Sequence, residues 1–439
     1  MFFDYLSRLD AFFWGYVAFI LIMVMGLFLS IKSNFFQLTQ LPQFFKIFFN
    51  EIGKSSENRR GVHPLRVFFA STGGMIGIGN IVGIATAVQL GGPGALVWIW
   101  IAGIVGAIVK YCEIYLGFKY RIENEHGGYD GGPMFYLRKA FKSGVLPFCV
   151  SLLLCVYGVE IYQFSVIADS IIVNWHINRF LVVGLLVAAV LWASYGGVRR
   201  IGTICSWVVP LFVLVYVGMG IWIVSTEIHA LPGLFAVVFK SAFTGHAAVG
   251  AFAGGGMILA VQHGIARAAY SADIGVGYDS ILQSESSTTN PNQQARLSIL
   301  GVFIDNMICT VTILIVLLSG AWSLGGQGSN VVQSALSHYF PYMEYFLPFF
   351  YIATGYTTLI AYFCVGIKCA RYLLPSIGPK LYFCFGTVML TVFSFLPQRN
   401  ALLVMSLCGS LLLIINLLGI FRLRREVFFN KEESLAINN

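Results

Sequence analysis

Residues 71–80 read Ser-Thr-Gly-Gly-Met-Ile-Gly-Ile-Gly-Asn and combine four glycines with hydroxyl and amide side chains. They lie inside an apolar segment, residues 67–90, that is long enough to cross a bilayer. Each glycine lowers helix propensity by about 1 kcal/mol relative to alanine, so the helix tends to unwind here. Unwound backbone at membrane depth lines cavities, and its free carbonyl and N–H groups suit a hard cation and a carboxylate. We therefore predict a substrate site that includes Ser71, Thr72, Gly73, Gly77, Gly79 and Asn80. The alternative is a small-residue packing face between helices.

A second glycine cluster, residues 245–256, opens the apolar segment 247–267. Two interrupted helices in corresponding positions of two halves point to the binding site of a transporter. We therefore add Phe252, Gly254 and Gly255 to the predicted substrate site. The alternative is that the glycines only reflect the high glycine content of membrane helices.

Ionisable side chains inside apolar segments are costly and indicate function by default. Five such residues stand out in the predicted spans: Lys110, Glu113, Glu160, Asp169 and Asp305. Lys110 and Glu113 lie three positions apart on one helical face, and we expect them to pair with each other as a structural ion pair. The spacing assigns no role to the two aspartates.

Composition sets the class of protein. The chain has 439 residues, of which 58% are hydrophobic and 10% charged, whereas soluble domains have about 25% charged residues. This indicates a polytopic membrane protein. The net charge of +8 is then an excess of Lys and Arg in cytoplasmic loops rather than a signal for nucleic acid. The nine cysteines and seven histidines show no metal spacing, and we expect neither an enzyme nor a cofactor.

Eleven apolar segments predict an all-α protein that crosses the membrane about eleven times, as one integral membrane domain over residues 1–439. The segments are about 11–30, 67–90, 95–118, 146–173, 180–195, 203–225, 247–267, 298–319, 344–374, 380–396 and 401–421. Segment 11–30 is an extra helix. The other ten form two five-helix sets, over 67–225 and 247–421, and an odd number of spans gives the two sets opposite orientations.

Loop charges predict the orientation. Most Lys and Arg residues in the loops fall on one side, and the other side holds only Arg8, Arg179, Lys240 and Arg399. The positive-inside rule then places the N-terminus outside and the C-terminus in the cytoplasm of a multi-pass plasma membrane protein, in bacteria an inner membrane protein. We also expect an interfacial amphipathic segment at 34–50 and a polar, turn-rich cytoplasmic loop at 271–296.

Several motifs, in chain order, resemble the signature of the alanine/glycine:cation symporter family. They are TGGMIGIGNIVGIAT (72–86), GGPGA (91–95), KYCE (110–113), KYR (119–121), GGPM (131–134), GAFAG (250–254) and GVFID (301–305). The resemblance covers most of the chain. It implies a fold of the leucine-transporter (LeuT) type, with a 5+5 inverted repeat, and sodium-coupled uptake of alanine or glycine. The chain departs from the family pattern at Ile78, Glu160, Ala272-Asp273, near Tyr362 and at Ile367.

The resemblance also implies site residues. In the superfamily, a sodium site lies between the first interrupted helix and hydroxyls of a later helix. Here the corresponding oxygens come from Gly73, Ile76, Thr354, Thr357 and Thr358, although threonines in helices also bond back to their own helix. Gln163 matches a family glutamine that faces the substrate, and Tyr362 stands near a family tryptophan. Both join the predicted substrate site.

Glu160 lies three residues from Gln163 and replaces a neutral amide of the family. It is a countercharge for a substrate ammonium, a proton carrier, or a structural hydrogen-bonding group. Our leading interpretation is sodium-coupled import of a small neutral amino acid, with Na⁺ and the lipid bilayer as the other partners. The alternative is proton-coupled symport through Glu160. A membrane sensor or enzyme on a transporter scaffold is a remote third reading.

Overall fold

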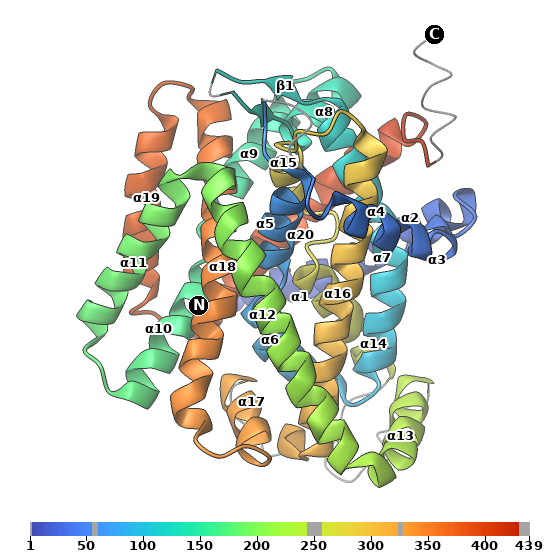
Figure 1. Cartoon of the computed structure of the whole chain (residues 1–439), viewed down its shortest axis with the longest axis vertical. Coiled ribbons are helices and arrows are strands. Elements are labelled where there is room, and N and C mark those ends of the chain that lie inside the picture. The colour runs from blue at the N-terminus through green and yellow to red at the C-terminus, as the bar shows by residue number, and fades with distance from the viewer. Residues whose placement is uncertain (1, 55–59, 126, 244–256, 324–327, 430–439) are drawn as a thin grey trace.

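The computed structural model describes residues 2–54, 60–125, 127–243, 257–323 and 328–429, and these are almost entirely helical (Figure 1). The predicted glycine-cluster residues Phe252, Gly254 and Gly255 lie outside the described residues. The first half contains α1 (Phe2–Phe12), the π-helical η1 (Phe13–Ala18), α2 (Phe19–Lys32), α3 (Phe36–Thr39), α4 (Leu41–Glu51), α5 (Pro64–Met75), the 3-10 turn η2 (Ile78–Asn80), α6 (Val82–Gly91), α7 (Ala95–Lys119), the hairpin strands β1 (Ile122–Glu123) and β2 (Tyr129–Asp130), α8 (Pro133–Phe141), α9 (Val145–Tyr157), α10 (Ile161–Trp175), α11 (Arg179–Tyr195) and α12 (Gly197–Thr226).

The second half continues with the 3-10 turn η3 (Ile228–Ala230), α13 (Leu231–Phe243), α14 (Met257–Ser271), α15 (Tyr278–Gln283), α16 (Pro291–Leu318), the 3-10 turn η4 (Ala321–Ser323), α17 (Gly328–Ser337), α18 (Met343–Leu373), α19 (Gly378–Phe393) and α20 (Gln398–Leu423). The short helices α8 and α15 and strand β1 lie at one end of the bundle, and α13 and α17 lie at the other (Figure 1).

A helix lies in each of the eleven predicted spans. Within the described residues, seven helical segments are long and apolar enough to cross a membrane, and the bent pair α5–α6 makes an eighth. α11 and α19 are shorter apolar helices, and α14 is the described part of the remaining span. α13 is a further short helix that the hydropathy pattern did not predict as a separate element.

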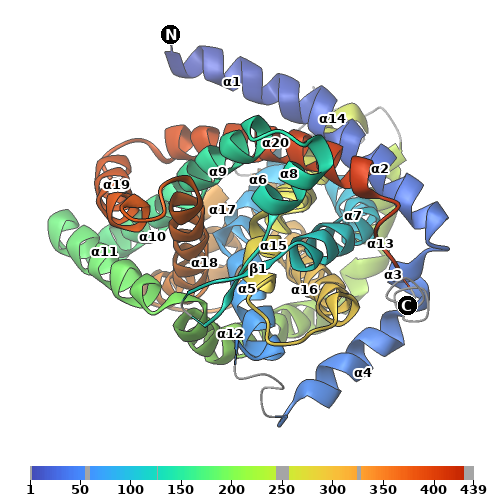
Figure 2. The same cartoon turned by 90° about the horizontal axis from the view of Figure 1, so that it is seen from above.

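The core sits where α7 packs against α2, α14 and α16 and where α18 packs against α9, α10 and α12. α1 lies at the edge of the bundle and α2 runs on beside α7 (Figure 2). The indole of Trp14 fixes this N-terminal helix through a hydrogen bond of 3.1 Å to the carbonyl of Ser406 on α20. Residues 34–50 form α3 and α4, with Phe45 and Phe49 exposed, as expected of an amphipathic segment.

The predicted polar loop at 271–296 is wrong. Most of this segment is buried inside the bundle, and part of it forms α15 and the start of α16. Its polar groups find partners there. The guanidinium of Arg121 donates to the carbonyls of Ser284, Ser286 and Thr288 at 2.8, 2.6 and 2.8 Å. A segment whose backbone is satisfied in this way can be buried despite a polar sequence.

Candidate functional site

The first interruption lies where the glycine cluster predicts it. α5 ends at Met75, η2 and α6 follow, and the two helical arms are bent by 51°. The freed N–H of Gly77 donates to the side-chain oxygen of Asn80 at 3.0 Å, and that of Ile78 to Gln163 at 3.0 Å. A Cβ at Gly77 would lie 2.5 Å from the Gln163 amide oxygen and 2.6 Å from the Thr358 hydroxyl, so only glycine fits here.

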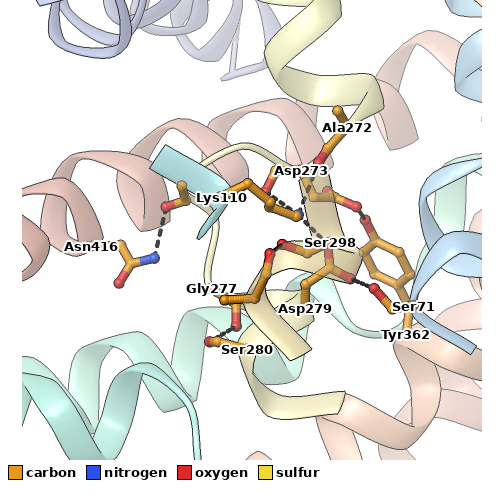
Figure 3. Close-up of polar contacts among 12 residues, drawn as sticks. Ser71, Lys110, Ala272, Asp273, Gly277, Asp279, Ser280, Ser298, Tyr362 and Asn416 are labelled. Atoms are coloured by element: carbon orange, nitrogen blue, oxygen red, sulfur yellow. Dashed lines mark hydrogen bonds and ion pairs between the residues drawn. The ribbon is translucent and has the colours of Figure 1, made fainter. Parts of the chain in front are cut away.

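A second interruption within the described residues follows α14, whereas the predicted one at the glycine cluster 245–256 lies outside them. Residues 272–277 are not helical, and Asp273, Gly275 and Gly277 have φ of 48°, 75° and 97°. The carboxylate of Asp273 accepts hydrogen bonds from the hydroxyls of Tyr157, at 3.0 Å, and Tyr362 (Figure 3). Sequence reasoning missed this break, because a polar segment with two glycines reads as an ordinary loop. The available signal was the sequence Gly275-Val276-Gly277, which begins two residues after Asp273.

A small cavity lies between the two breaks. Gly74, Met75, Gly79, Tyr157, Glu160, Gln163, Tyr270, Ser271 and Tyr362 line it. Of the predicted substrate residues, Gly79, Glu160, Gln163 and Tyr362 are therefore at the cavity. The other described members of the predicted set belong to the first interrupted helix, in α5, at its break or in η2. They are Ser71, Thr72, Gly73, Gly77 and Asn80.

Two polar atoms in this cavity have no hydrogen-bond partner among the described residues. One is Oε1 of Glu160, which sits in the left-handed position between α9 and α10 with φ of 54° and is only 2% exposed. The other is the buried hydroxyl of Tyr270 near the end of α14. Buried polar groups are normally paired. An acceptor and a donor left without partners in one cavity therefore point to a ligand that carries both characters.

The predicted sodium ligands converge beside this cavity. The hydroxyl of Thr358 lies 3.1 Å from the carbonyl oxygen of Gly73 and 3.2 Å from that of Thr354. The Thr357 hydroxyl lies 2.7 Å from the same Thr354 carbonyl. Ile76 caps α5 at the same break. The threonine hydroxyls thus bond within α18, as the alternative reading expects, while Thr358 also reaches the interrupted helix.

Asp305 links the two breaks. It accepts hydrogen bonds from Nδ2 of Asn80 at 2.5 Å and from the hydroxyl of Ser271 at 3.0 Å. The Thr312 hydroxyl, two turns after Asp305 on α16, donates to the Asn80 carbonyl at 2.9 Å. Asn80 therefore fixes the unwound turn of the first helix and ties it to the end of α14. The other unassigned aspartate, Asp169, pairs with Arg179 at 3.1 Å, far along α10 from the cavity residues.

The predicted pair between Lys110 and Glu113 is wrong. Lys110 pairs instead with Asp279 on α15, and it donates to the carbonyls of Ala272 and Asp273. Neither carboxylate oxygen of Glu113 makes a hydrogen bond to a described residue. The local spacing allowed an i,i+3 pair, but the tertiary structure offers Lys110 three acceptors at once.

A cluster of charges lies at the end of the bundle that carries the hairpin. Lys368 of α18 pairs with Asp130 at 2.8 Å and with Glu285 at 2.6 Å. Burial raises the pKa of Asp130, but the Lys368 ammonium outweighs burial and holds the pKa below its usual range. The cluster ties α18 to β2 and to the segment after α15.

A bundle of membrane helices with interrupted helices around a buried polar cavity is the architecture of a secondary transporter. Solved structures with the same fold agree. MhsT in complex with L-phenylalanine matches with a TM-score of 0.60 and 14% identity, over 83% of this chain and 90% of that one. A Na⁺-coupled sialic acid symporter matches with a TM-score of 0.58 and 9% identity, over 95% and 87%. The LeuT-type fold predicted from the sequence is confirmed.

Relatives in sequence give the family. An uncharacterized transporter of Bacillus subtilis (strain 168), YflA, is 32% identical over 85% of this chain and 81% of its own length. The sodium/alanine symporter AgcS of Methanococcus maripaludis is 28% identical over 86% and 84%. The sequence model of the sodium:alanine symporter family matches residues 2–433, and the chain belongs to this family. The predicted resemblance is confirmed, and the protein is a multi-pass membrane transporter rather than an enzyme.

Proposed function

We propose that the protein imports a small neutral amino acid, such as alanine or glycine, together with Na⁺ by alternating access. The observation that carries this proposal is the pair of unpartnered atoms in the cavity, Oε1 of Glu160 and the hydroxyl of Tyr270. An amino acid zwitterion offers an ammonium group for the first and a carboxylate for the second. The names of the relatives support the same substrate class, since AgcS is a sodium/alanine symporter.

The residues that line the cavity favour a substrate with a small side chain. Three tyrosines, Tyr157, Tyr270 and Tyr362, line it, and Tyr362 stacks on Tyr278 with ring centroids 4.0 Å apart. Gly79 also lines the cavity, and a Cβ there would meet only the Tyr270 ring, at 4.0 Å. The open space next to Gly79 is where we place the substrate side chain.

For sodium we propose the oxygens of Gly73, Ile76, Thr354, Thr357 and Thr358. Carbonyl and hydroxyl oxygens are the ligands that hard cations prefer. The convergence of Gly73, Thr354 and Thr358 supports this site. An ion there would bridge α5 and α18, so that sodium binding would stabilise one arrangement of the interrupted helix against the rest of the bundle.

Proton-coupled symport is the second candidate. It is favoured by one observation, the buried carboxyl group of Glu160 at the cavity, a position where the family resemblance implies a neutral amide. A buried carboxylate can carry a proton across with the substrate. The two candidates share the substrate and differ in the driving ion.

Uptake into proteoliposomes tests both candidates. Labelled alanine, glycine and serine, each as L- and D-isomer, are offered with a sodium gradient or a proton gradient imposed separately. We expect accumulation of at least one of them with the sodium gradient alone. Accumulation driven by protons in sodium-free buffer would replace sodium by the second candidate. Failure of all these substrates to bind or accumulate would reject the proposed substrate class.

We further propose that the N-terminus lies outside and the C-terminus in the cytoplasm, in a bacterial inner membrane. The support is the distribution of Lys and Arg in the loops. In this orientation α8, α15 and strand β1 lie at the cytoplasmic end and α17 at the outer end (Figure 1). The Lys368 cluster would then close the cytoplasmic side of the site.

A further inference from the structure

The ammonium group of Lys110 is fully buried in the middle of the bundle. Lys110 belongs to α7, and its side chain is 0% exposed. Its Nζ donates to the carbonyl of Ala272 at 2.9 Å and to that of Asp273 at 2.8 Å, and forms an ion pair with Asp279 (Figure 3). An ammonium has three N–H donors, so each donor has an acceptor. A buried charge is tolerated only when it is satisfied in this way.

All three acceptors belong to the second helix break. Ala272 and Asp273 directly follow the last residue of α14, and Asp279 lies in the first turn of α15. The carbonyls at a helix C-terminus carry the negative end of the helix dipole, which attracts a cation. The second oxygen of Asp279 accepts a hydrogen bond of 2.7 Å from the Ser71 hydroxyl on α5. One ammonium group thus joins both arms of the second interrupted helix and, through Asp279, the first.

Two carbonyl oxygens and one carboxylate form a donor set that a hard metal cation also prefers. Such cations hold the unwound backbone of interrupted helices in transporters. We propose that Lys110 is a tethered cation, which does at the second helix break what a bound metal cation would do, and that it thereby positions Asp273 against the tyrosines of the substrate cavity.

Asp273 connects Lys110 to the substrate cavity. Its backbone is left-handed, a conformation that aspartate and asparagine adopt more often than most other residues apart from glycine. Its carbonyl is held by Lys110, while its carboxylate accepts the hydroxyls of Tyr157 and Tyr362. Both tyrosines line the cavity. A displacement of the Lys110 ammonium would therefore move the cavity wall, although Lys110 does not line the cavity itself.

Two other carbonyls of the break have neutral partners. Gly275 accepts a hydrogen bond of 2.9 Å from Nδ2 of Asn416, and Gly277 one of 2.7 Å from the Ser280 hydroxyl (Figure 3). Lys110 is thus the only cation that contacts the described backbone between α14 and α15. This separates the proposal from a simple ion pair, which would need Asp279 but not the carbonyls.

The first test replaces the tethered cation by a free one. Lys110→Ala leaves a cavity that ends at the same three acceptors. We expect it to lower the thermal midpoint of the purified protein, and millimolar n-propylammonium to raise the midpoint of this variant by at least about 2 °C while leaving the parent unchanged. Tetramethylammonium has the same charge but no N–H donor, and should have no effect. A folded Lys110→Ala protein that responds equally to both ions, or to neither, would overturn the proposal.

The second test separates positioning from charge balance. Lys110→Met combined with Asp279→Asn removes the ion pair and both of its charges. We expect this variant to fold but to bind substrate at least about tenfold more weakly, because the carbonyls of the break are no longer held. Unchanged affinity would identify an ordinary ion pair and reject the proposal. Loss of folding in both variants, with propylammonium present throughout purification, would reject it as well, since the role would then be purely structural.

The affinity measurement depends on the proposed function, whereas the thermal measurement does not use a substrate. If Lys110→Ala is rescued by propylammonium but no amino acid binds the parent protein, the proposed substrate class fails and the tethered cation stands. If the parent protein transports alanine but propylammonium does not rescue Lys110→Ala, the proposed substrate class stands and the tethered cation fails.

Discussion

The hydroxyl of Thr358 on α18 lies 3.1 Å from the carbonyl oxygen of Gly73 on α5. This is a direct contact between the first interrupted helix and a helix far along the chain. Thr358 also donates to the carbonyl of Thr354 at 3.2 Å, so that one hydroxyl and two carbonyl oxygens meet at one point. An alternating-access transporter needs such a contact to change when an ion binds.

The sodium proposal predicts that the hydroxyls of α18 set the sodium affinity. Replacing Thr357 and Thr358 together with Val removes two hydroxyl oxygens with little change in volume. We expect the apparent sodium affinity in substrate uptake to fall by at least about tenfold, or about 1.4 kcal/mol. Thr387→Val is the matched control, because the Thr387 hydroxyl bonds only to the Phe383 carbonyl on its own helix, α19. Unchanged sodium dependence in the folded double variant would rule out this site.

The space next to Gly79 leads to a prediction about the size of the substrate side chain. Gly79 lines the cavity, and a methyl group there would make only an ordinary contact with Tyr270. Gly79→Ala should therefore fold and fill the space that we assign to the substrate side chain. We expect uptake of alanine to fall at least about tenfold relative to uptake of glycine, because overpacking a tight site costs about 1–3 kcal/mol. Gly184→Ala on α11 is the control, since a Cβ there meets nothing within 4 Å. Equal losses for both substrates would place the side chain elsewhere.

The first helix break could be predicted from the sequence because its cause is local. Four glycines within residues 71–80 weaken the helix whatever surrounds it. The second break could not, because its backbone is held open by distant partners, namely Lys110 on α7 and Asn416 on α20. The same distance explains the wrong pairing of Lys110 with Glu113. Tyr270 offers no local signal either, since its hydroxyl becomes informative only when the cavity around it is known.

The Lys368 cluster predicts how stability depends on pH. The pKa of Asp130 is lowered in the folded protein, so its ion pair contributes stability above the unfolded pKa of about 3.9 and loses it as the pH falls through the lower folded value. We expect the thermal midpoint of Asp130→Asn to lie below that of the parent by a constant amount between pH 5 and 7, and the difference to shrink below about pH 4. Glu344→Gln is the control, because Glu344 has no ion pair to a described residue. A difference that grows toward low pH would contradict the assignment.

Orientation can be tested with single cysteines, but not in residues 284–292, where the structure buries most positions. Ser337→Cys at the end of α17 and Ser143→Cys after α8 are both exposed and lie at opposite ends of the bundle (Figure 1). The parent for both should lack Cys384, which is exposed on α19. An impermeant thiol reagent should label Ser337→Cys in intact cells and Ser143→Cys only after lysis. Labelling in the opposite order would place the C-terminus outside.

Glu160 decides between the two driving ions. Its Oε1 has no described hydrogen-bond partner, and Glu160 lines the same cavity as Tyr270. As a countercharge, it predicts that Glu160→Gln weakens substrate affinity, by about 1.5–3 kcal/mol for a hydrogen bond to a charged group, and leaves the driving ion unchanged. As a proton carrier, it predicts that Glu160→Gln abolishes uptake driven by a pH gradient and preserves exchange of substrate across the membrane. A structural role predicts loss of thermal stability with near-normal kinetics.

We expect the countercharge result, because the family resemblance gives sodium-coupled relatives a neutral amide at this position and so no need for a proton site. Tyr270→Phe provides the matched comparison, since it removes only the hydroxyl that we assign to the substrate carboxylate. Both variants should lower affinity for alanine, and Tyr270→Phe alone should retain the binding of an amine that lacks a carboxylate. Measuring Kd for alanine and for ethylamine in both variants separates the two ends of the zwitterion. Uptake of alanine by protons alone in sodium-free buffer, abolished in Glu160→Gln, would defeat both the countercharge role and the assignment of sodium.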